Sequence, residues 1–404
     1  MAPNKRKIIN DPVHGFITVS HPVIFSIIEH PYYQRLRRIQ QMAMAQLVYP
    51  GAVHTRLLHS LGAYHLMGCA IAELRGKGVE ITQEEETAVK AGILLHDIGH
   101  GPFSHALEEV LVEGVHHEQL SLQLMRKLNN DLNGQLDLAI RIFTNEYHKP
   151  FLHQLISGQL DVDRMDYLSR DSFFSGVSEG VIGYDRILKM LVVHNGELMV
   201  EEKGIYSVEK FLVARRQMYW QVYLHKTVLA AERMLVKILE RVREIHSAQD
   251  KHLVTLTGLD FFLGDFDGHM NEAVLEKFCS IDDHDVMHAV KHWTRHPDKI
   301  LSLLCNRFLQ RRLYKARLQS EPFPDAALEK YRKEAMEKFG VSAKEVHYFC
   351  FTGEATNTLY KTKDESINIL FRDGSVKDIA GIENALIDQN LSAQVKKFYI
   401  CLLT

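Results

Sequence analysis

The pair His96-Asp97 constrains this 404-residue chain more than any other feature. It stands at the end of an apolar run, residues 87–95, and Gly99 and Gly101 follow at once. The apolar run predicts a buried helix, and the two glycines predict where it ends. Imidazole nitrogen beside carboxylate oxygen suits a divalent transition ion better than calcium. The stretch therefore predicts a metal site where a buried helix opens into a loop.

A histidine at a helix end can also do no more than cap carbonyl groups or face solvent. Two other segments favour the metal. Segment 54–62 carries His59 on a predicted helix whose apolar residues recur at helical spacing, so this imidazole can point inward. Segment 161–167 carries three aspartates with basic and aromatic neighbours. Together they supply a second imidazole and further carboxylates for one ion.

Helical patterns dominate the first two thirds of the chain. A capping box over 82–85 begins the helix that leads to His96. Asn and Gly residues over 129–134 predict a turn, and 136–147 then has helical periodicity. Asn195-Gly196 between two short apolar stretches predicts a β-hairpin over 191–200. Residues 208–246 form one long helical pattern with room for one break.

The C-terminal part has a different pattern. Strand-type stretches at 346–351 and 367–371 and a turn at Asp373-Gly374 predict a small α+β lobe, and Glu321–Asp325 is the expected linker before it. We therefore expect a mainly α-helical protein with a β-hairpin. The expected parts are an N-terminal segment 1–50, a helical core 51–320 and the α+β lobe 321–404.

Composition excludes several classes of protein. A formal net charge of −3 gives no global footprint for nucleic acid, so any anion site needs a local cluster of basic side chains. The five cysteines are scattered without paired spacing, which indicates reduced thiols and a cytoplasmic location. No stretch approaches about 18 apolar residues, and no apolar segment follows the basic N-terminus, so neither a membrane span nor a secretion signal is expected.

The remaining candidate residues match the needs of phosphate ester hydrolysis. That reaction needs an activated water, cations for the phosphate oxygens and an acid for the leaving oxygen. A metal can supply the first. Forked donors for a polyphosphate are available from Arg56, Arg164 and Arg215. Because imidazole titrates near neutral pH, the candidates for proton transfer are His100, His105 and His117.

These motifs, in this order, resemble the HD phosphohydrolase superfamily. Within it they are most similar to deoxynucleoside triphosphate triphosphohydrolases of the SAM-and-HD-domain type and their bacterial relatives. The resemblance begins near Asn10–Gly15 and extends to about Lys226. It implies an HD-type helical core, a divalent ion (Mn, Fe, Ni, Zn or Mg) and a homo-oligomer, most often a dimer of dimers. The metal set that it implies is His59, His96, Asp97 and Asp163.

The resemblance also implies roles in catalysis and substrate binding. His117 matches a catalytic acid near the α-phosphate, His100 and His105 match phosphate-side histidines, and Glu108 stands where relatives carry a catalytic-network aspartate. The implied substrate contacts are Gln41, Arg56, Arg164, Tyr167, Asp171, Arg215 and Tyr223. On that analogy water attacks the α-phosphate of a nucleotide substrate, giving a deoxynucleoside and inorganic triphosphate.

Some positions depart from the family pattern. Met42 replaces a leucine that, in relatives, helps to exclude a ribose 2′-hydroxyl, and Leu224 replaces a glutamine that contacts the base. Arg164 occupies a position where close relatives have lysine. Base and sugar preference therefore stay open. Two other classes also stay open: another HD-type nucleotidase or phosphodiesterase, and a non-catalytic protein that binds nucleotide or nucleic acid. The presence of His117 favours catalysis.

The N-terminal segment raises a separate question. By resemblance it could hold an activating nucleotide such as dGTP. The residues concerned would be Asn10, Glu29, Gln34 and Arg37. The alternative is that the same segment only packs subunits together.

Overall fold

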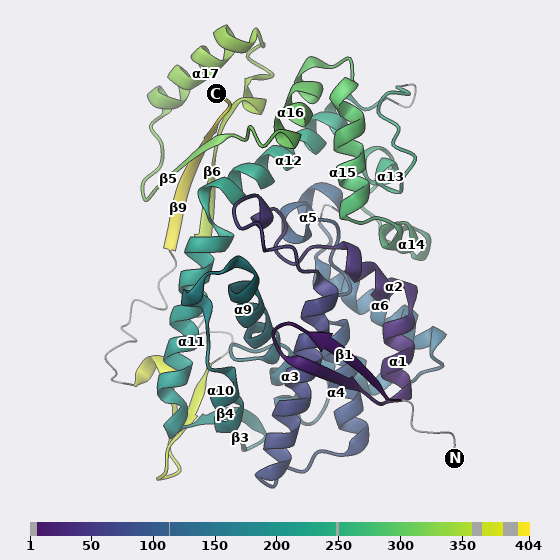
Figure 1. Cartoon of the computed structure of the whole chain (residues 1–404), viewed down its shortest axis with the longest axis vertical. Helices are drawn as coiled ribbons and strands as arrows, with labels where there is room; N and C mark the ends of the chain where they lie inside the picture. The colour runs from purple at the N-terminus through teal and green to yellow at the C-terminus, as the bar shows by residue number, and fades with distance from the viewer. Residues whose placement is uncertain (1–5, 113, 248–249, 358–365, 383–394) are drawn as a thin grey trace.

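The computed structural model describes residues 6–112, 114–247, 250–357, 366–382 and 395–404. Helices make up most of these ranges, and small sheets flank them, as the sequence predicts (Figure 1). The helices are α1 (Pro22–Glu29), α2 (Pro31–Gln34), α3 (Arg56–Gly76), α4 (Gln83–Leu95), α5 (Glu108–Leu111), α6 (His117–Asp131), α7 (Asp137–Phe143), α8 (Pro150–Ile156), α9 (Val162–Ser175), α10 (Tyr184–Met190), α11 (Ile205–Met218), α12 (Lys226–Ile245), α13 (Leu259–Gly264), α14 (Glu272–Ser280), α15 (Asp283–His292), α16 (Lys299–Leu309) and α17 (Asp325–Phe339).

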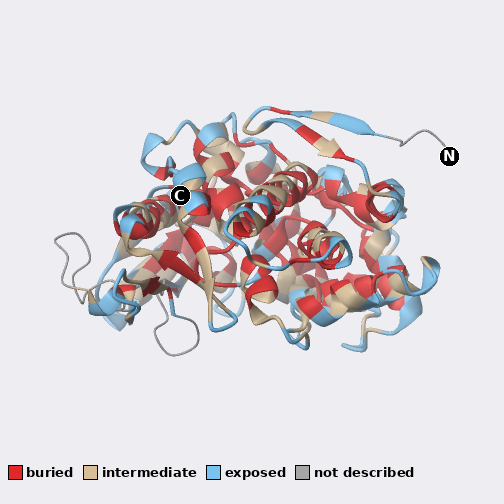
Figure 2. Cartoon of the chain, turned by 90° about the horizontal axis from the view of Figure 1, so that it is seen from below, coloured by how far each residue is buried: buried red, intermediate tan, exposed pale blue. Residues whose placement is uncertain are grey.

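Three of these helices form the core around the predicted metal site. Helix α3 packs against both α4 and α9. The capping box predicted for α4 is present: the backbone N–H of Glu85 donates to the Thr82 hydroxyl at 3.1 Å, and that of Thr82 donates to the Glu85 carboxylate at 2.8 Å. The buried side chains form one continuous core through these helices, red in Figure 2. The metal residues of α4 therefore follow a helix that is fixed at its start and buried along its length.

The long helical pattern is broken once. Helix α11 is followed by a single π-helical stretch, Tyr219–Tyr223, and α12 continues beyond it. The shorter pattern at 136–147 gives only α7, which ends at Phe143, because Asn145 adopts a left-handed φ of 58°. The break between α11 and α12 places Tyr219 and Tyr223 in the wall of the cavity described below.

The strands form three small sheets within the described ranges. They are β1 (Lys7–Asp11), β2 (Gly15–Val19), β3 (Leu191–His194), β4 (Glu197–Glu201), β5 (Lys315–Gln319), β6 (Cys350–Asn357), β7 (Asn368–Leu370), β8 (Val376–Asp378) and β9 (Val395–Leu402). The predicted hairpin is β3–β4, and its turn residues Asn195 and Gly196 have φ of 52° and 83°, as a tight two-residue turn requires.

The C-terminal strands pair with strands that precede residue 321. One sheet has the order β3-β4-β7-β8, with β4 and β7 parallel, and the other has the order β5-β9-β6. The expected linker, Glu321–Asp325, connects β5 to α17. Both sheets therefore include elements from each side of the expected boundary at 320/321, and they lie toward opposite ends of the α11–α12 pair (Figure 1).

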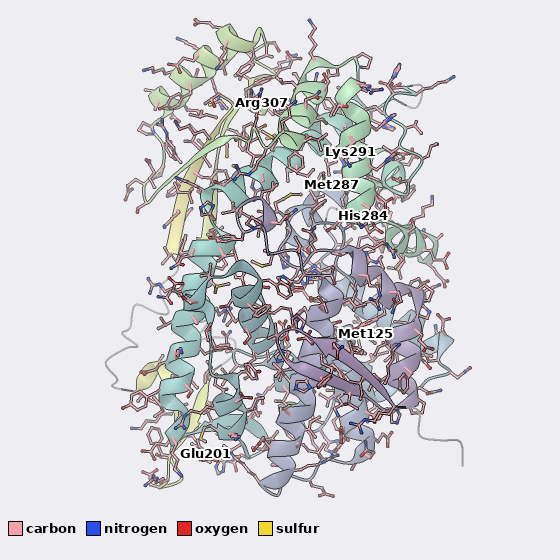
Figure 3. The ribbon with its side chains drawn as sticks, viewed as in Figure 1. Met125, Glu201, His284, Met287, Lys291 and Arg307 are labelled. Carbon is pink, nitrogen blue, oxygen red and sulfur yellow. The ribbon has the colours of Figure 1, made fainter. Side chains whose placement is uncertain are left out.

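The N-terminal hairpin β1–β2 lies along the outside of the helical body (Figures 1 and 2). Within the hairpin, Ile17 and Val19 of β2 are fully buried, whereas Ile8 of β1 and Phe16 of β2 are exposed. Figure 3 labels His284, Met287 and Lys291 on α15; His284 and Lys291 are exposed, whereas Met287 packs against the core. Among the described residues, no helix is long and apolar enough to cross a membrane.

Candidate metal centre and substrate cavity

The four predicted metal ligands converge from α3, α4 and α9. Asp163 Oδ1 lies 2.9 Å from Nε2 of His59 and 3.2 Å from Nε2 of His96, and these two nitrogens are 3.4 Å apart. The carboxylate oxygens of Asp97 lie 3.7 Å from His59 Nε2 and 3.3 Å from His96 Nε2. Residues separated by about a hundred positions in sequence thus form one compact group of nitrogen and oxygen donors.

The hydrogen bonds on the far side of each imidazole show that this group fits a cation. His96 Nδ1 lies 2.6 Å from the carbonyl oxygen of Ile93, and His59 Nδ1 lies 2.8 Å from Asp166 Oδ2. Both oxygens accept, so each Nδ1 carries a proton, and each imidazole directs its Nε2 to the centre, where the lone pair of the neutral form would bind a metal. Two lone pairs beside two carboxylates repel one another unless a cation lies among them. The donor set suits Mn, Fe, Ni or Zn.

The electrostatics of the centre point the same way. Burial lowers the pKa of His59, but hydrogen bonds and charge from Asp163 and Asp166 outweigh it and raise that pKa to about 10. Burial also lowers the pKa of His96, yet Asp97 and Asp163 raise it overall. Burial alone would raise the pKa of Asp97, but the neighbouring His96 holds it well below its usual range. Without a metal, the carboxylates thus favour protonated, positively charged imidazoles, and a bound cation would replace that positive charge.

A second group of side chains lies beside the first. The imidazoles of His100 and His117 stack with ring centroids 3.9 Å apart. Glu108 accepts the backbone N–H of His117 at 2.8 Å, and it lies 3.1 Å from His117 Nδ1 and 3.2 Å from His105 Nδ1. Burial would raise the pKa of Glu108, but these histidines hold it far below its usual range. A charged carboxylate thus fixes the orientation of His117.

Both groups line one cavity of about 580 Å³. From the metal centre, Asp97 and Asp163 line the cavity. From the second group, the lining residues are His100, His105 and His117. Six of the seven predicted substrate contacts also line it: Gln41, Arg56, Tyr167, Asp171, Arg215 and Tyr223.

Arg164, the seventh predicted contact, is not among the lining residues. Its guanidinium instead pairs with Asp161 and with the carbonyl oxygen of Gly158. Arg56 lines the cavity but is already bound: it pairs with Asp97, and its Nε donates to the Ser104 hydroxyl at 2.7 Å. Of the three arginines proposed from the sequence, Arg56 and Arg215 thus line the cavity and Arg164 does not.

The cavity also contains residues that the motifs did not single out. Tyr219, Glu232 and Arg233 line it from the π-helical stretch and α12. Burial raises the pKa of Glu232 to about 7, although Arg233 opposes this. The sequence does contain a pattern that places Glu232 beside other cavity residues. Leu224, Val228 and Glu232 are spaced by four, the spacing of residues on one side of a helix.

Asp171 is held at the cavity wall by two donors. His54 Nε2 lies 2.7 Å from one carboxylate oxygen, and the Tyr223 hydroxyl donates to the other at 2.6 Å. His54 was not predicted as a site residue. Its partner comes from a helix more than a hundred residues later, so only the fold reveals the contact.

The residues considered for an activating nucleotide do not line this cavity. Gln34 donates to the carbonyl oxygen of Ile28 at 2.6 Å, and Arg37 Nε donates to Gln34 Oε1 at 2.6 Å. Asn10 is exposed on β1, and Glu29 is exposed at the end of α1. These four residues are thus part of the surface, away from the lining of the cavity.

Comparison with known proteins agrees with this geometry. The HD domain model matches residues 56–171, and the model for the HD-associated region matches residues 182–264. A crystal structure of a phosphohydrolase from Bacteroides thetaiotaomicron is 48% identical and superposes with a TM-score of 0.94, covering 99% of this chain and 100% of that one. The uncharacterized protein YwfO of Bacillus subtilis is 34% identical over 77% of this chain and 72% of its own length.

A third relative carries a more specific name. It is the deoxynucleoside triphosphate triphosphohydrolase SAMHD1 homolog of Dictyostelium discoideum, 32% identical over 57% of this chain and 48% of its own length. The chain thus spans about half the length of that relative. A helical core with a two-histidine, two-aspartate centre beside a cavity defines a metal-binding hydrolase. The chain belongs to the HD-domain phosphohydrolase family.

Proposed function

We propose that this protein is a metal-dependent hydrolase that converts deoxynucleoside triphosphates to deoxynucleosides and inorganic triphosphate. The observation that carries the proposal is the composition of the 580 Å³ cavity beside the metal centre. It joins the metal ligands and the histidine group to Arg215 and to Tyr167 and Tyr223, which is more than metal binding needs. The name of the Dictyostelium relative supports the same substrate class.

In this proposal each part of the cavity has a separate task. The metal, when bound, polarises a phosphate oxygen and lowers the pKa of a water molecule. Arg215, whose Nη1 contacts Gln159 Oε1 at 3.2 Å, offers further donors to a phosphate group. His117, oriented by Glu108, donates a proton to the leaving oxygen as the deoxynucleoside departs. Tyr167 and Tyr223 present aromatic surface to the sugar and base.

The test is a product analysis. The purified protein is incubated with a mixture of deoxy and ribo nucleoside triphosphates and Mn²⁺ or Mg²⁺, with and without added dGTP, and the products are resolved by chromatography. His96→Ala removes a metal ligand, and His148→Ala, an exposed imidazole, is the matched control. We expect deoxynucleoside and triphosphate from the wild type and the control, and neither from His96→Ala.

Other products would redirect the assignment. Orthophosphate or a linear dinucleotide would indicate a different HD-type phosphohydrolase. No turnover with either metal would refute the proposal for these substrates and favour a binding role. A rate that depends on dGTP would support an activating site.

A further inference from the structure

The N-terminal hairpin reaches the metal centre through a buried carboxylate. His14 lies in the turn between β1 and β2, and its side chain is fully buried. Its Nε2 lies 2.6 Å from Asp166 Oδ1. The other oxygen of Asp166 lies 2.8 Å from Nδ1 of His59. One carboxylate thus connects the hairpin to a metal ligand.

A second connection runs through Arg170. Its Nη1 donates to Asp11 Oδ2 at 2.8 Å, while its Nε and Nη2 donate to the two oxygens of Asp166 at 2.9 and 3.0 Å. Asp11, the last residue of β1, also accepts the backbone N–H groups of Val13 and His14, each at 2.9 Å. The residue that anchors the hairpin to Arg170 therefore also shapes the turn that presents His14.

The packing around Asp166 leaves little room for other arrangements. A Cβ atom at Gly62, one turn beyond His59 on α3, would lie 2.0 Å from Asp166 Oδ1 and 2.2 Å from Arg170 Nη2. A glycine at this position lets both side chains approach the helix that carries His59. Removing the His14 imidazole takes away one donor to Asp166 and opens the space that this ring fills, so the carboxylate gains room to turn away from the imidazole of His59.

We propose that His14 is a positioning residue of the metal centre: through Asp166, the β1–β2 hairpin sets the orientation of His59 and thereby the affinity for the metal. A hydrogen bond from a ligand imidazole to a carboxylate fixes its tautomer and makes its other nitrogen a better donor. By linkage, metal binding must stabilise the docked hairpin as much as the hairpin favours metal binding. This inference concerns metal binding and does not depend on the substrate.

The experiment measures metal affinity in folded protein. Wild type, His14→Ala and His14→Gln are titrated with Co²⁺, followed by its visible absorption spectrum. The glutamine side chain can place an N–H where His14 has Nε2, so it can donate the same hydrogen bond. His65→Ala is the matched control, because the His65 ring stacks on His14 with centroids 5.5 Å apart, while its Nε2 contacts Cys69 Sγ at 3.7 Å.

Removing the direct partner of a ligand imidazole usually weakens metal binding by about 10- to 100-fold. Because His14 acts one contact further out, we expect His14→Ala to weaken Co²⁺ binding by about 10-fold and to change the spectrum. His14→Gln should restore the affinity to within about threefold of wild type, and His65→Ala should not differ. A His14→Ala variant that melts at a lower temperature but binds Co²⁺ with wild-type affinity and spectrum would overturn the proposal, because the hairpin would then only support the fold.

A second measurement covers the case in which His14→Ala does not fold. Amide hydrogen exchange of the wild-type protein is compared with and without Mn²⁺. Slower exchange in residues 7–19 on metal addition is the expected result. Unchanged exchange there, in protein that a titration shows to be metal-loaded, would contradict the coupling. Neither readout uses turnover, so a failed activity assay leaves both conclusions intact.

Discussion

Arg35 offers a sharp test of how the loop after Asp97 is held. Its side chain is buried, with 1% exposed, and it donates to the carbonyl oxygens of Ile98 at 2.8 Å and His100 at 2.9 Å. Its guanidinium also lies 5.0 Å from the ring centroid of Phe278. Arg35→Met retains most of the side-chain length while removing every donor. The carbonyl groups of Ile98 and His100 then lose a partner, as does that of Ile281, which lies 3.5 Å from Nη1.

The magnitude follows from these contacts. A buried group that loses its hydrogen bond costs about 1–3 kcal/mol, and relief from burying a guanidinium offsets part of the total, which leaves ~3 kcal/mol. The unfolding entropy is about 2.1 cal/mol/K per residue, and the chain has 404 residues. If the whole chain unfolds as one unit, a loss of ~3 kcal/mol divided by this total entropy lowers the Tm by about 4 °C. A smaller cooperative unit would give a larger fall.

Thermal unfolding followed by circular dichroism measures the shift. Arg37→Met is the control. Arg37 is exposed and its Nε donates to the nearby Gln34 Oε1, so its replacement should change stability by less than about 0.5 kcal/mol. An Arg35→Met variant that melts within about 1 °C of wild type would refute the reasoning, because the two hydrogen bonds would then contribute little to the loop.

Three further outcomes are expected. The pKa of Glu232 is about 7 in the folded protein and near 4.5 in the unfolded chain, so ionisation of this carboxyl destabilises the fold increasingly as the pH rises from about 4.5 to 7. Glu232→Gln should therefore raise the Tm relative to wild type by more at pH 8 than at pH 5.5. A Tm difference that does not change with pH would contradict this. Gly99→Ala should lower the free energy of unfolding by about 1–3 kcal/mol, and with it the Tm, because the new Cβ would lie 2.3 Å from two backbone atoms of α6. A variant as stable as wild type would show that α6 can move aside. In the activity assay, Arg215→Ala should raise KM at least about tenfold, whereas Arg164→Ala should raise it less than about threefold because its guanidinium is engaged outside the cavity; equal effects would show that both reach the substrate.

Local signals in the sequence predicted local structure well. The capping box of α4 and the Asn195-Gly196 turn depend only on residues a few positions apart, and both are confirmed. The structure brings His59, His96 and Asp163 together, an arrangement that only the family resemblance could suggest from sequence, and their role as metal ligands stays a prediction.

Contacts that have no local signature could not be predicted. The pairing of His14 with Asp166 joins residues 152 positions apart, and nothing near either residue indicates the other. For Arg164 a local motif exists but does not match the structure. Its neighbours in sequence match a substrate-binding motif, but its guanidinium forms an ion pair with the Asp161 carboxylate. Sequence position tells which residue types are available, while competition among neighbouring partners decides which of them face the cavity.

The shared sheets at the C-terminal end have a practical consequence for the integrity of the molecule. Strand β5 has β9 as its neighbour in the sheet, and β4 has β7 as one of its two neighbours, although the expected linker Glu321–Asp325 separates the members of each pair in sequence. A protein shortened to end before residue 321 would expose bare strand edges, which pair readily with other molecules and promote aggregation. A protease cut within that linker would have a different result: two fragments on a denaturing gel, and one undivided particle in solution.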